Sequence, residues 1–164
     1  MEKIEEILNY TKKNKCDLHS HLLHICNLLR THNIKSVFTN NSEQGHIANF
    51  VKFLDGNISL NSQSEDCEMF GDYENCTFID KQLETIKIQD YEMMQLDCSQ
   101  EFNDWDLYTA RIIRLNPKFV ILCNTKKNIQ NSKIILKALT RKPYNIDTTF
   151  DDYYGMIILK YRSK

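Results

Sequence analysis

The sequence has few of the residues that interrupt regular structure, and it has no long apolar run. Four glycines and two prolines occur among 164 residues, which excludes collagen-like chains and chains that are disordered because they are rich in both. No stretch of about 18 apolar residues is present, so a membrane-spanning helix is not expected. The first residues, MEKIEEILNYTKKNK, are too polar and acidic for a signal peptide. We therefore expect an intracellular, cytoplasmic protein.

Neither sign of charge dominates the sequence. There are 21 Lys and Arg residues against 22 Asp and Glu residues, which gives a net charge of −1. This balance does not indicate nucleic acid or an anionic membrane as the partner, although it is compatible with a local patch. The C-terminal third holds a group of cations that form either a solvated helix face or an edge facing phosphate or RNA. They are Lys126, Lys127, Lys133, Lys137, Arg141 and Lys142.

Six cysteines occur, but no two have the C-x-x-C spacing of a metal or redox site. Without a secretion signal we expect reduced thiols, which serve more often as small core residues than as nucleophiles. The chain is rich in Asn, Lys and Ile and poor in Gly. Such a composition is typical of an AT-rich genome, for example a viral or parasitic one.

One short motif has the residue types of a metal site. Asp17, His19 and His21 resemble the D-x-H-x-H opening of metal-dependent hydrolases, but those enzymes place both histidines at a strand end. The apolar spacing here predicts a helix instead, with Asp17 as its N-cap. His21 and His24 could share a metal ion, yet a helical His pair is more commonly structural. We expect no metal.

Strands and helices are predicted to alternate along most of the chain. Helical spacing of apolar residues covers residues 1–13, 16–31, 46–54, 104–115 and 128–139. Short apolar runs predict strands at residues 34–39, 57–60, 76–79, 91–96, 119–123, 145–150 and 156–161. Shorter elements are predicted near residues 65–70 and 83–88. This alternation favours one α/β domain over residues 1–164 with a mainly parallel sheet, closed by an antiparallel hairpin.

Residues 91–125 carry the clearest indication of a ligand site. An apolar strand ends in Asp97, a helix follows, and a second buried strand is followed by Asn124 and Thr125. Ligands of open parallel sheets bind outside the carboxyl ends of the strands, so these three side chains are expected at a ligand site. Asp97 has a local alternative, because it could cap the helix that begins near Asn103 or bind a backbone amide.

The order of elements resembles the class I S-adenosylmethionine-dependent methyltransferases, and most closely their small O-methyltransferases. The similarity covers residues 17–160 and is carried by three stretches. They are DLHSHLLHICNLLRTHNIKSVFTNNSEQGHIANFVKFL, YEMMQLDCSQEFNDWDLYTARIIRLNPKFVILCNT and FDDYYGMIILK. The resemblance implies a doubly wound, mainly parallel sheet with helices on both faces, a C-terminal antiparallel hairpin, and S-adenosylmethionine as the cofactor.

The resemblance also implies positions for a cofactor. The family's glycine-rich first loop corresponds to residues 39–45, where Gly45 is the one glycine and where Asn40 and Asn41 could take up the backbone angles of lost glycines. The family's acidic residue at the end of the second strand, which binds the ribose hydroxyls, corresponds to Asn61. The loop and the ribose-binding position are thus present in the sequence, but their residues are weaker cofactor ligands than those of the family.

Asp97 matches the acid that ends strand four, which is a magnesium ligand in metal-dependent members of the family. Their second ligand pair, Asp-Asn after strand five, corresponds here to Cys123 and Asn124. Because magnesium prefers oxygen donors, Cys123 argues against a magnesium site. The cofactor-binding candidates are therefore Asn40, Asn41, Gly45, Asn61, Asp97 and Asn124, with no metal and no assigned catalytic residue.

Two functions are compatible with a sheet pattern of the family that carries weakened cofactor-binding residues. The first is a degenerate methyltransferase-like protein, a pseudoenzyme that serves as a non-catalytic interaction or structural module and acts through a protein partner or through self-association. The second is a diverged but active methyltransferase. In that case the asparagines and Gly45 would hold S-adenosylmethionine, and Asp97 or Asn124 would orient the acceptor. Weak motifs do not exclude the enzyme, since methyl transfer depends mainly on in-line positioning.

Overall fold

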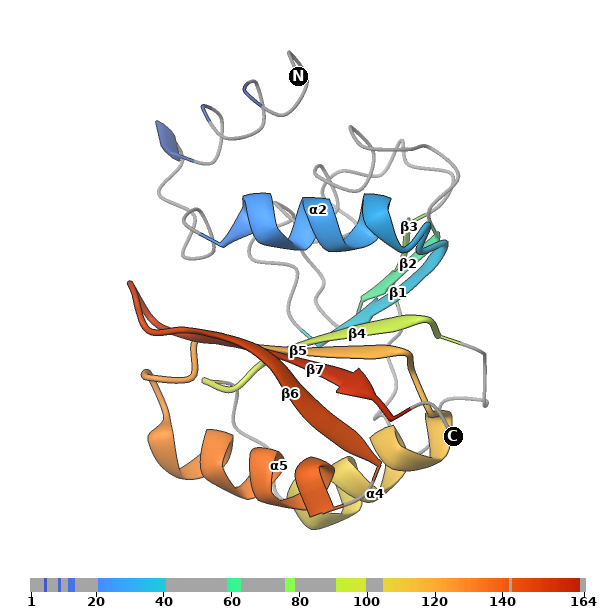
Figure 1. The fold of residues 1–164 in the computed structure, drawn as a ribbon, viewed down its shortest axis with the longest axis vertical. Helices are drawn as coiled ribbons and strands as arrows, with labels where there is room; N and C mark the ends of the chain where they lie inside the picture. Colours follow the sequence, from blue (N-terminus) through green and yellow to red (C-terminus); the bar gives the residue numbers. More distant parts are fainter. Residues whose placement is uncertain are drawn as a thin grey trace. The chain divides into compact units, whose positions relative to one another are not determined.

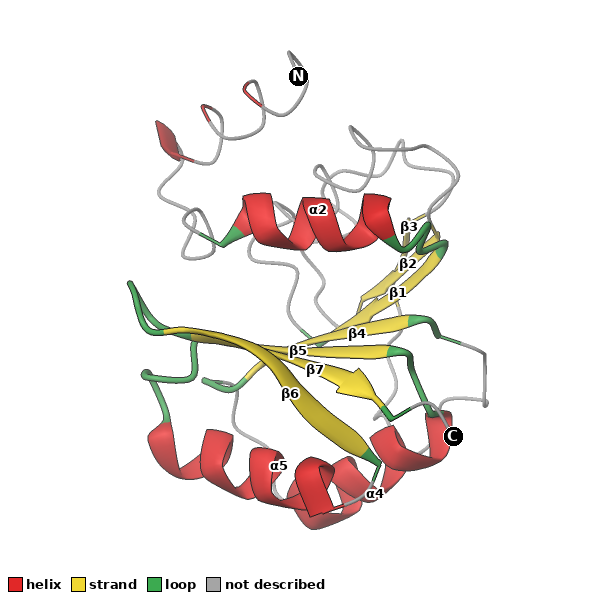
Figure 2. Cartoon of the chain, viewed as in Figure 1, coloured by secondary structure: helices red, strands yellow, loops and turns green. Residues whose placement is uncertain are grey.

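The structure is a computed structural model of the whole chain. It describes residues 5, 9, 12–13, 21–40, 59–62, 76–78, 91–99, 105–141 and 143–162, which are coloured along the chain in Figure 1 and by secondary structure in Figure 2. The chain divides into two compact units, Met1–Ile79 and Asp80–Lys164. The prediction of one domain stays a prediction. The elements expected over residues 46–54, 65–70 and 83–88 lie outside the described residues.

The first unit contains a small parallel sheet. Its strands are β1 (Ser36–Thr39), β2 (Ser59–Ser62) and β3 (Cys76–Phe78), and they lie in the order β3-β2-β1. The predicted strands over residues 34–39 and 76–79 are confirmed. β2 extends two residues beyond its predicted end, so Asn61 lies within the strand rather than after it.

Helix α2 (Leu22–Thr31) precedes β1 in this unit and turns Ile25 and Leu29 into the core. It ends at Thr31, and two residues later Asn33 has a φ of 50°, the left-handed conformation that often follows a helix end. The amide of Ile34 then donates to the carbonyl of Leu29 at 2.9 Å. The helix has His21 at its N-cap and begins at Leu22, later than predicted. Asp17, the predicted N-cap, lies outside the described residues.

The second unit contains a mixed sheet in the order β4-β5-β7-β6. Strands β4 (Met93–Asp97) and β5 (Phe119–Cys123) are parallel. Strand β7 (Met156–Tyr161) runs antiparallel to β5, and β6 (Tyr144–Phe150) runs antiparallel to β7. The predicted antiparallel hairpin at the C-terminal end is confirmed, and Figure 1 shows it as the two red strands labelled β6 and β7.

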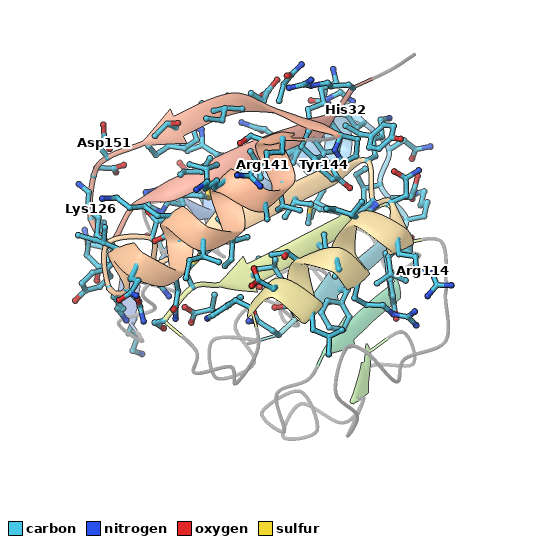
Figure 3. All side chains as sticks on the ribbon, turned by 90° about the horizontal axis from the view of Figure 1, so that it is seen from below. His32, Arg114, Lys126, Arg141, Tyr144 and Asp151 are labelled. Carbon is cyan, nitrogen blue, oxygen red and sulfur yellow. The ribbon has the colours of Figure 1, made fainter. Side chains whose placement is uncertain are left out.

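The core of this unit is centred on β4 and β5. Every residue of both strands is buried, which is the burial expected of parallel strands covered on both faces. Helix α4 (Trp105–Leu115) packs with Trp105, Ile112 and Leu115 inward. Helix α5 (Ile129–Arg141) packs with Ile135 and Leu139 inward. The two helices lie side by side, as Figure 3 shows from below.

The start of β6 is fixed by a buried tyrosine. The hydroxyl of Tyr144 donates to the carbonyl of Pro117 at 2.7 Å, and its ring meets that of Tyr161 edge to face with 5.5 Å between centroids. Burial, followed by the neighbouring Tyr161, raises the pKa of Tyr144 well above its usual range. This bond joins the hairpin to the segment that follows α4, where Asn116 has a φ of 55° and ends the helix.

Among the described residues, no helix is long and apolar enough to cross a membrane.

Candidate ligand-binding edge

In the first unit, two predicted site residues lie on neighbouring parallel strands. Asn40 directly follows β1 and is buried, with 6% of its surface exposed. In the sheet register Asn61 of β2 stands opposite Phe38, and Ser62 stands opposite Thr39. Asn61 and Asn40 therefore come to the carboxyl ends of adjacent strands. Asn41 and Gly45 lie outside the described residues.

In the second unit, Asp97 and Asn124 lie at the carboxyl ends of the neighbouring strands β4 and β5. Asp97 ends β4 opposite Cys123, the last residue of β5, and Asn124 follows directly. Asp97 and Asn124 are each 1% exposed. Asn124 has a φ of 54°, so the chain turns sharply as it leaves β5. The predicted positions of both residues at the carboxyl ends of parallel strands are confirmed, and their part in a ligand site stays a prediction.

The carboxylate of Asp97 closes the turn that follows its own strand. One oxygen, Oδ1, accepts from the backbone amide of Ser99 at 2.8 Å and from its hydroxyl at 2.6 Å. A carboxylate that binds the amide two residues on is an Asx turn. The local alternative for Asp97, binding a backbone amide, is therefore confirmed.

Two buried thiols flank these groups. Cys98 and Cys123 are both reduced and buried, and the amide of Cys98 donates to the carbonyl of Cys123 at 3.0 Å. Burial, and then the charge of Asp97, raises the pKa of Cys98 from 9.0 to about 12. A thiol with that pKa is protonated at neutral pH and is a poor nucleophile. For these two cysteines the prediction of core residues is confirmed.

The described part of the chain contains no cluster of metal-binding side chains. There, no group of three or more His, Cys, Asp and Glu side chains is arranged to hold a metal ion. Cys123 offers a buried thiol at the end of β5, and a thiol is a poor ligand for magnesium.

The loop after β5 is held by a distant turn, the one that joins β6 to β7. The amide of Lys126 donates to the carbonyl of Tyr154 at 2.9 Å, and the Lys126 ammonium donates to the carbonyl of Asp151. Figure 3 shows Lys126 and Asp151 at the same end of the unit. Gly155 makes this approach feasible. Its φ is +77°, and a Cβ there would lie 2.4 Å from the Thr125 hydroxyl oxygen.

The same turn presents two aromatic rings at the surface. Tyr153 is 54% exposed and Tyr154 is 37% exposed. Their rings meet edge to face with 4.5 Å between centroids, and the ammonium of Lys127 lies 4.4 Å from the Tyr154 ring centroid. Tyr153 has a φ of 55°, which is unusual for a bulky residue. The sequence signal for this feature is Gly155 directly after two tyrosines.

Helix α5 ties both loops of the edge together. The side-chain amide of Asn131 donates to the carbonyl of Cys98 at 3.3 Å. The hydroxyl of Ser132 reaches the carbonyl of Thr125 at 2.7 Å. The first turn of α5 therefore contacts the loop that follows β4 and the loop that follows β5.

No family model and no curated protein matches the sequence. Solved structures do match the fold. A candidate caffeoyl-CoA O-methyltransferase from Staphylococcus aureus has a TM-score of 0.69 at 14% identity, over 97% of this chain and 92% of that one. A methyltransferase from Geobacter sulfurreducens has a TM-score of 0.69 at 13% identity, over 99% and 89%. An S-adenosylhomocysteine-bound methyltransferase from Podospora anserina has a TM-score of 0.66 at 10% identity, over 99% and 89%.

These similarities extend over nearly the whole of this chain and of the compared chains. They confirm the predicted fold, the doubly wound α/β fold of class I methyltransferases with a mainly parallel sheet and a C-terminal antiparallel hairpin. At these identities the likeness concerns the fold alone.

Proposed function

We propose that this methyltransferase-like protein acts through binding rather than through catalysis, as an interaction or structural module. The observation that carries the proposal is the state of Asp97, whose Oδ1 is used by the amide and hydroxyl of Ser99. A carboxylate engaged in this way is a structural element of its loop. The protonated, buried thiol of Cys98 supplies no nucleophile beside it.

Such a module acts through a protein partner or through self-association, and Tyr153 and Tyr154 are the side chains that we propose for the contact. Tyrosine is enriched at interface hot spots because a large ring is immobilised at a low entropic cost. Here the rings are exposed, while the turn beneath them is held by Lys126 and Gly155. The contact surface is thus arranged before a partner binds.

The alternative is an active S-adenosylmethionine-dependent methyltransferase, and one observation favours it. A solved structure with the same fold was obtained with S-adenosylhomocysteine bound. In this chain the polar residues Asn40 and Asn61 lie at the carboxyl ends of β1 and β2, the edge at which open α/β sheets bind ligands. They would hold the cofactor, and Asp97 or Asn124 would orient the acceptor.

Calorimetric titration with S-adenosylmethionine and S-adenosylhomocysteine separates the two functions. We expect neither heat nor a thermal shift at millimolar ligand. Micromolar binding would contradict the non-catalytic proposal, provided that it is lost in Asn61→Ala and kept in Asn27→Ala, a matched change at an exposed position of α2. If neither ligand binds, sedimentation of the wild type and of Tyr153→Ala/Tyr154→Ala then tests the proposed contact through self-association.

A further inference from the structure

The second unit contains a long part of the sequence with positive charge only. Between Asp106 and Asp147 there are nine Lys and Arg residues and no Asp or Glu. The rest of the chain holds the other 12 cations together with all 22 acidic residues. The balanced net charge therefore conceals a strong separation of charge along the chain.

Three of these cations form a row on α5. Lys133, Lys137 and Arg141 follow one another at four-residue intervals and are all exposed. That interval places them on one side of the helix, about 6 Å apart along its axis. The buried side chains of α5 lie on the opposite side and are Ser132, Ile135 and Leu139. The row therefore faces away from the sheet.

A fourth cation lies on the neighbouring helix. Arg114 is exposed on α4, on the side opposite the inward-facing Ile112. Because α4 and α5 pack side by side, the cations of both helices share the outer surface of this layer. Figure 3 looks onto it and labels Arg114 and Arg141. We call these four residues, Arg114, Lys133, Lys137 and Arg141, the basic face.

Among the described residues of the unit, none neutralises the charges of the basic face. Across residues 91–99, 105–141 and 143–162, none of the four forms an ion pair or a side-chain hydrogen bond. Other cations of the unit have such contacts, since Lys126 donates to a backbone carbonyl and Arg162 donates to the side chain of Asn145. The basic face is thus an exposed cluster of positive charge whose ammonium and guanidinium groups can bind an external anion.

We propose that the basic face binds the phosphate backbone of a nucleic acid. Lys and Arg side chains that neutralise phosphates supply most of sequence-independent nucleic-acid binding. A protein partner fits less well, because Lys is depleted from protein interfaces. A membrane surface fits less well too, because an interfacial helix buries its apolar face in lipid and α5 already packs Ile135 and Leu139 inside the unit.

This binding goes beyond the proposed function and does not depend on it. The basic face lies on the outer sides of α4 and α5 and contains none of the polar residues at the strand ends. Binding of nucleic acid and binding of S-adenosylmethionine can therefore be measured and can fail separately.

The test uses the full chain and a fluorescently labelled single-stranded oligouridine, with binding measured by anisotropy between about 50 and 200 mM salt. The test variant is Lys133→Glu/Lys137→Glu/Arg141→Glu. The control variant, Lys12→Glu/Lys13→Glu/Arg30→Glu, makes the same change of charge at exposed positions of the first unit. We expect the test variant to bind at least tenfold more weakly and the control about as tightly as the wild type.

The salt dependence provides a second readout. Loss of three phosphate contacts should lower the slope of log K against log salt by about 2 for a single strand. The proposal is overturned if both variants weaken binding equally, if the wild type does not bind RNA at low salt, or if it binds phosphatidylserine vesicles instead. If the glutamate variant does not fold, Lys133→Gln/Lys137→Gln/Arg141→Gln serves in its place, because Gln is a comparable helix former.

Discussion

The two loops at the edge of the second unit are closed in opposite ways. The loop after β4 is closed locally, because Asp97 accepts hydrogen bonds from Ser99 two residues away. The loop after β5 is closed from a distance, because its residues Thr125 and Lys126 meet a turn that ends at Gly155. Both loops leave neighbouring parallel strands, yet only the first could form in a short peptide.

This difference indicates where the edge is rigid and why. A local turn depends on one side chain, and it adds little order beyond its own residues. The long-range closure instead couples the loop after β5 to the β6–β7 hairpin, and through Ser132 to the start of α5. We therefore expect substitutions at the long-range contact to affect stability more than substitutions at the local turn.

The largest expected effect is that of Gly155→Ala, which should lower the free energy of unfolding by about 3 kcal/mol. About half of this comes from a side chain at positive φ, and the rest comes from overpacking against the Thr125 hydroxyl, where the new Cβ would be 2.4 Å away. Urea unfolding followed by circular dichroism measures the loss.

A double-mutant cycle separates these two causes. Thr125→Ala removes the hydroxyl that the new Cβ would meet, so Gly155→Ala should cost about 1 kcal/mol less in that background. Equal costs in both backgrounds would mean that the new Cβ does not meet the Thr125 hydroxyl. Gln130→Ala, at an exposed position of α5, should change stability by less than about 0.5 kcal/mol.

The contrast between local and long-range closure also explains what the sequence could predict. Strand β5 was predicted with its observed bounds, because a run of five buried apolar residues is a local signal. The positions of Asp97 and Asn124 at neighbouring strand ends were predicted, because the carboxyl ends of parallel strands share one edge. The local role of Asp97 was among the alternatives, since Asp commonly binds a nearby amide.

Features that depend on distant partners were not predicted. β2 continues through the polar residues Asn61 and Ser62 because their backbones pair with β1, and no apolar pattern marks such an extension. The contact between Gly155 and Thr125 joins residues on different elements, and the single glycine at the turn specified a backbone angle but not a neighbour. The pattern of a single sequence contains local information, such as apolar runs and turn residues. It does not contain the contacts between distant residues.

At the local turn, Asp97→Ala should lower the free energy of unfolding by about 2 kcal/mol, because the amide and hydroxyl of Ser99 lose a charged acceptor. Asp97→Asn keeps an acceptor oxygen and should cost about half as much, and Ser99→Ala should cost about 1 kcal/mol. Urea unfolding at neutral pH checks this order. If Asn were as costly as Ala, the charge of Asp97 would matter more than its geometry.

The smallest expected effect concerns Cys98, which lies between the two loops, and it appears only in alkaline solution. Its folded pKa of about 12 lies above the ordinary value of 9.0, because burial and then Asp97 disfavour the thiolate. The folded state thus prefers the protonated thiol, so this contribution to stability is complete below pH 9.0 and is lost as pH rises toward 12. By pH 10 the loss should be about 1 kcal/mol. Urea unfolding of the wild type and of Cys98→Ala at several pH values isolates the contribution of the Cys98 thiol, since the two proteins share all their other titrating groups. A wild type that loses no more stability than Cys98→Ala above pH 9.0 would show that the thiol is accessible to water.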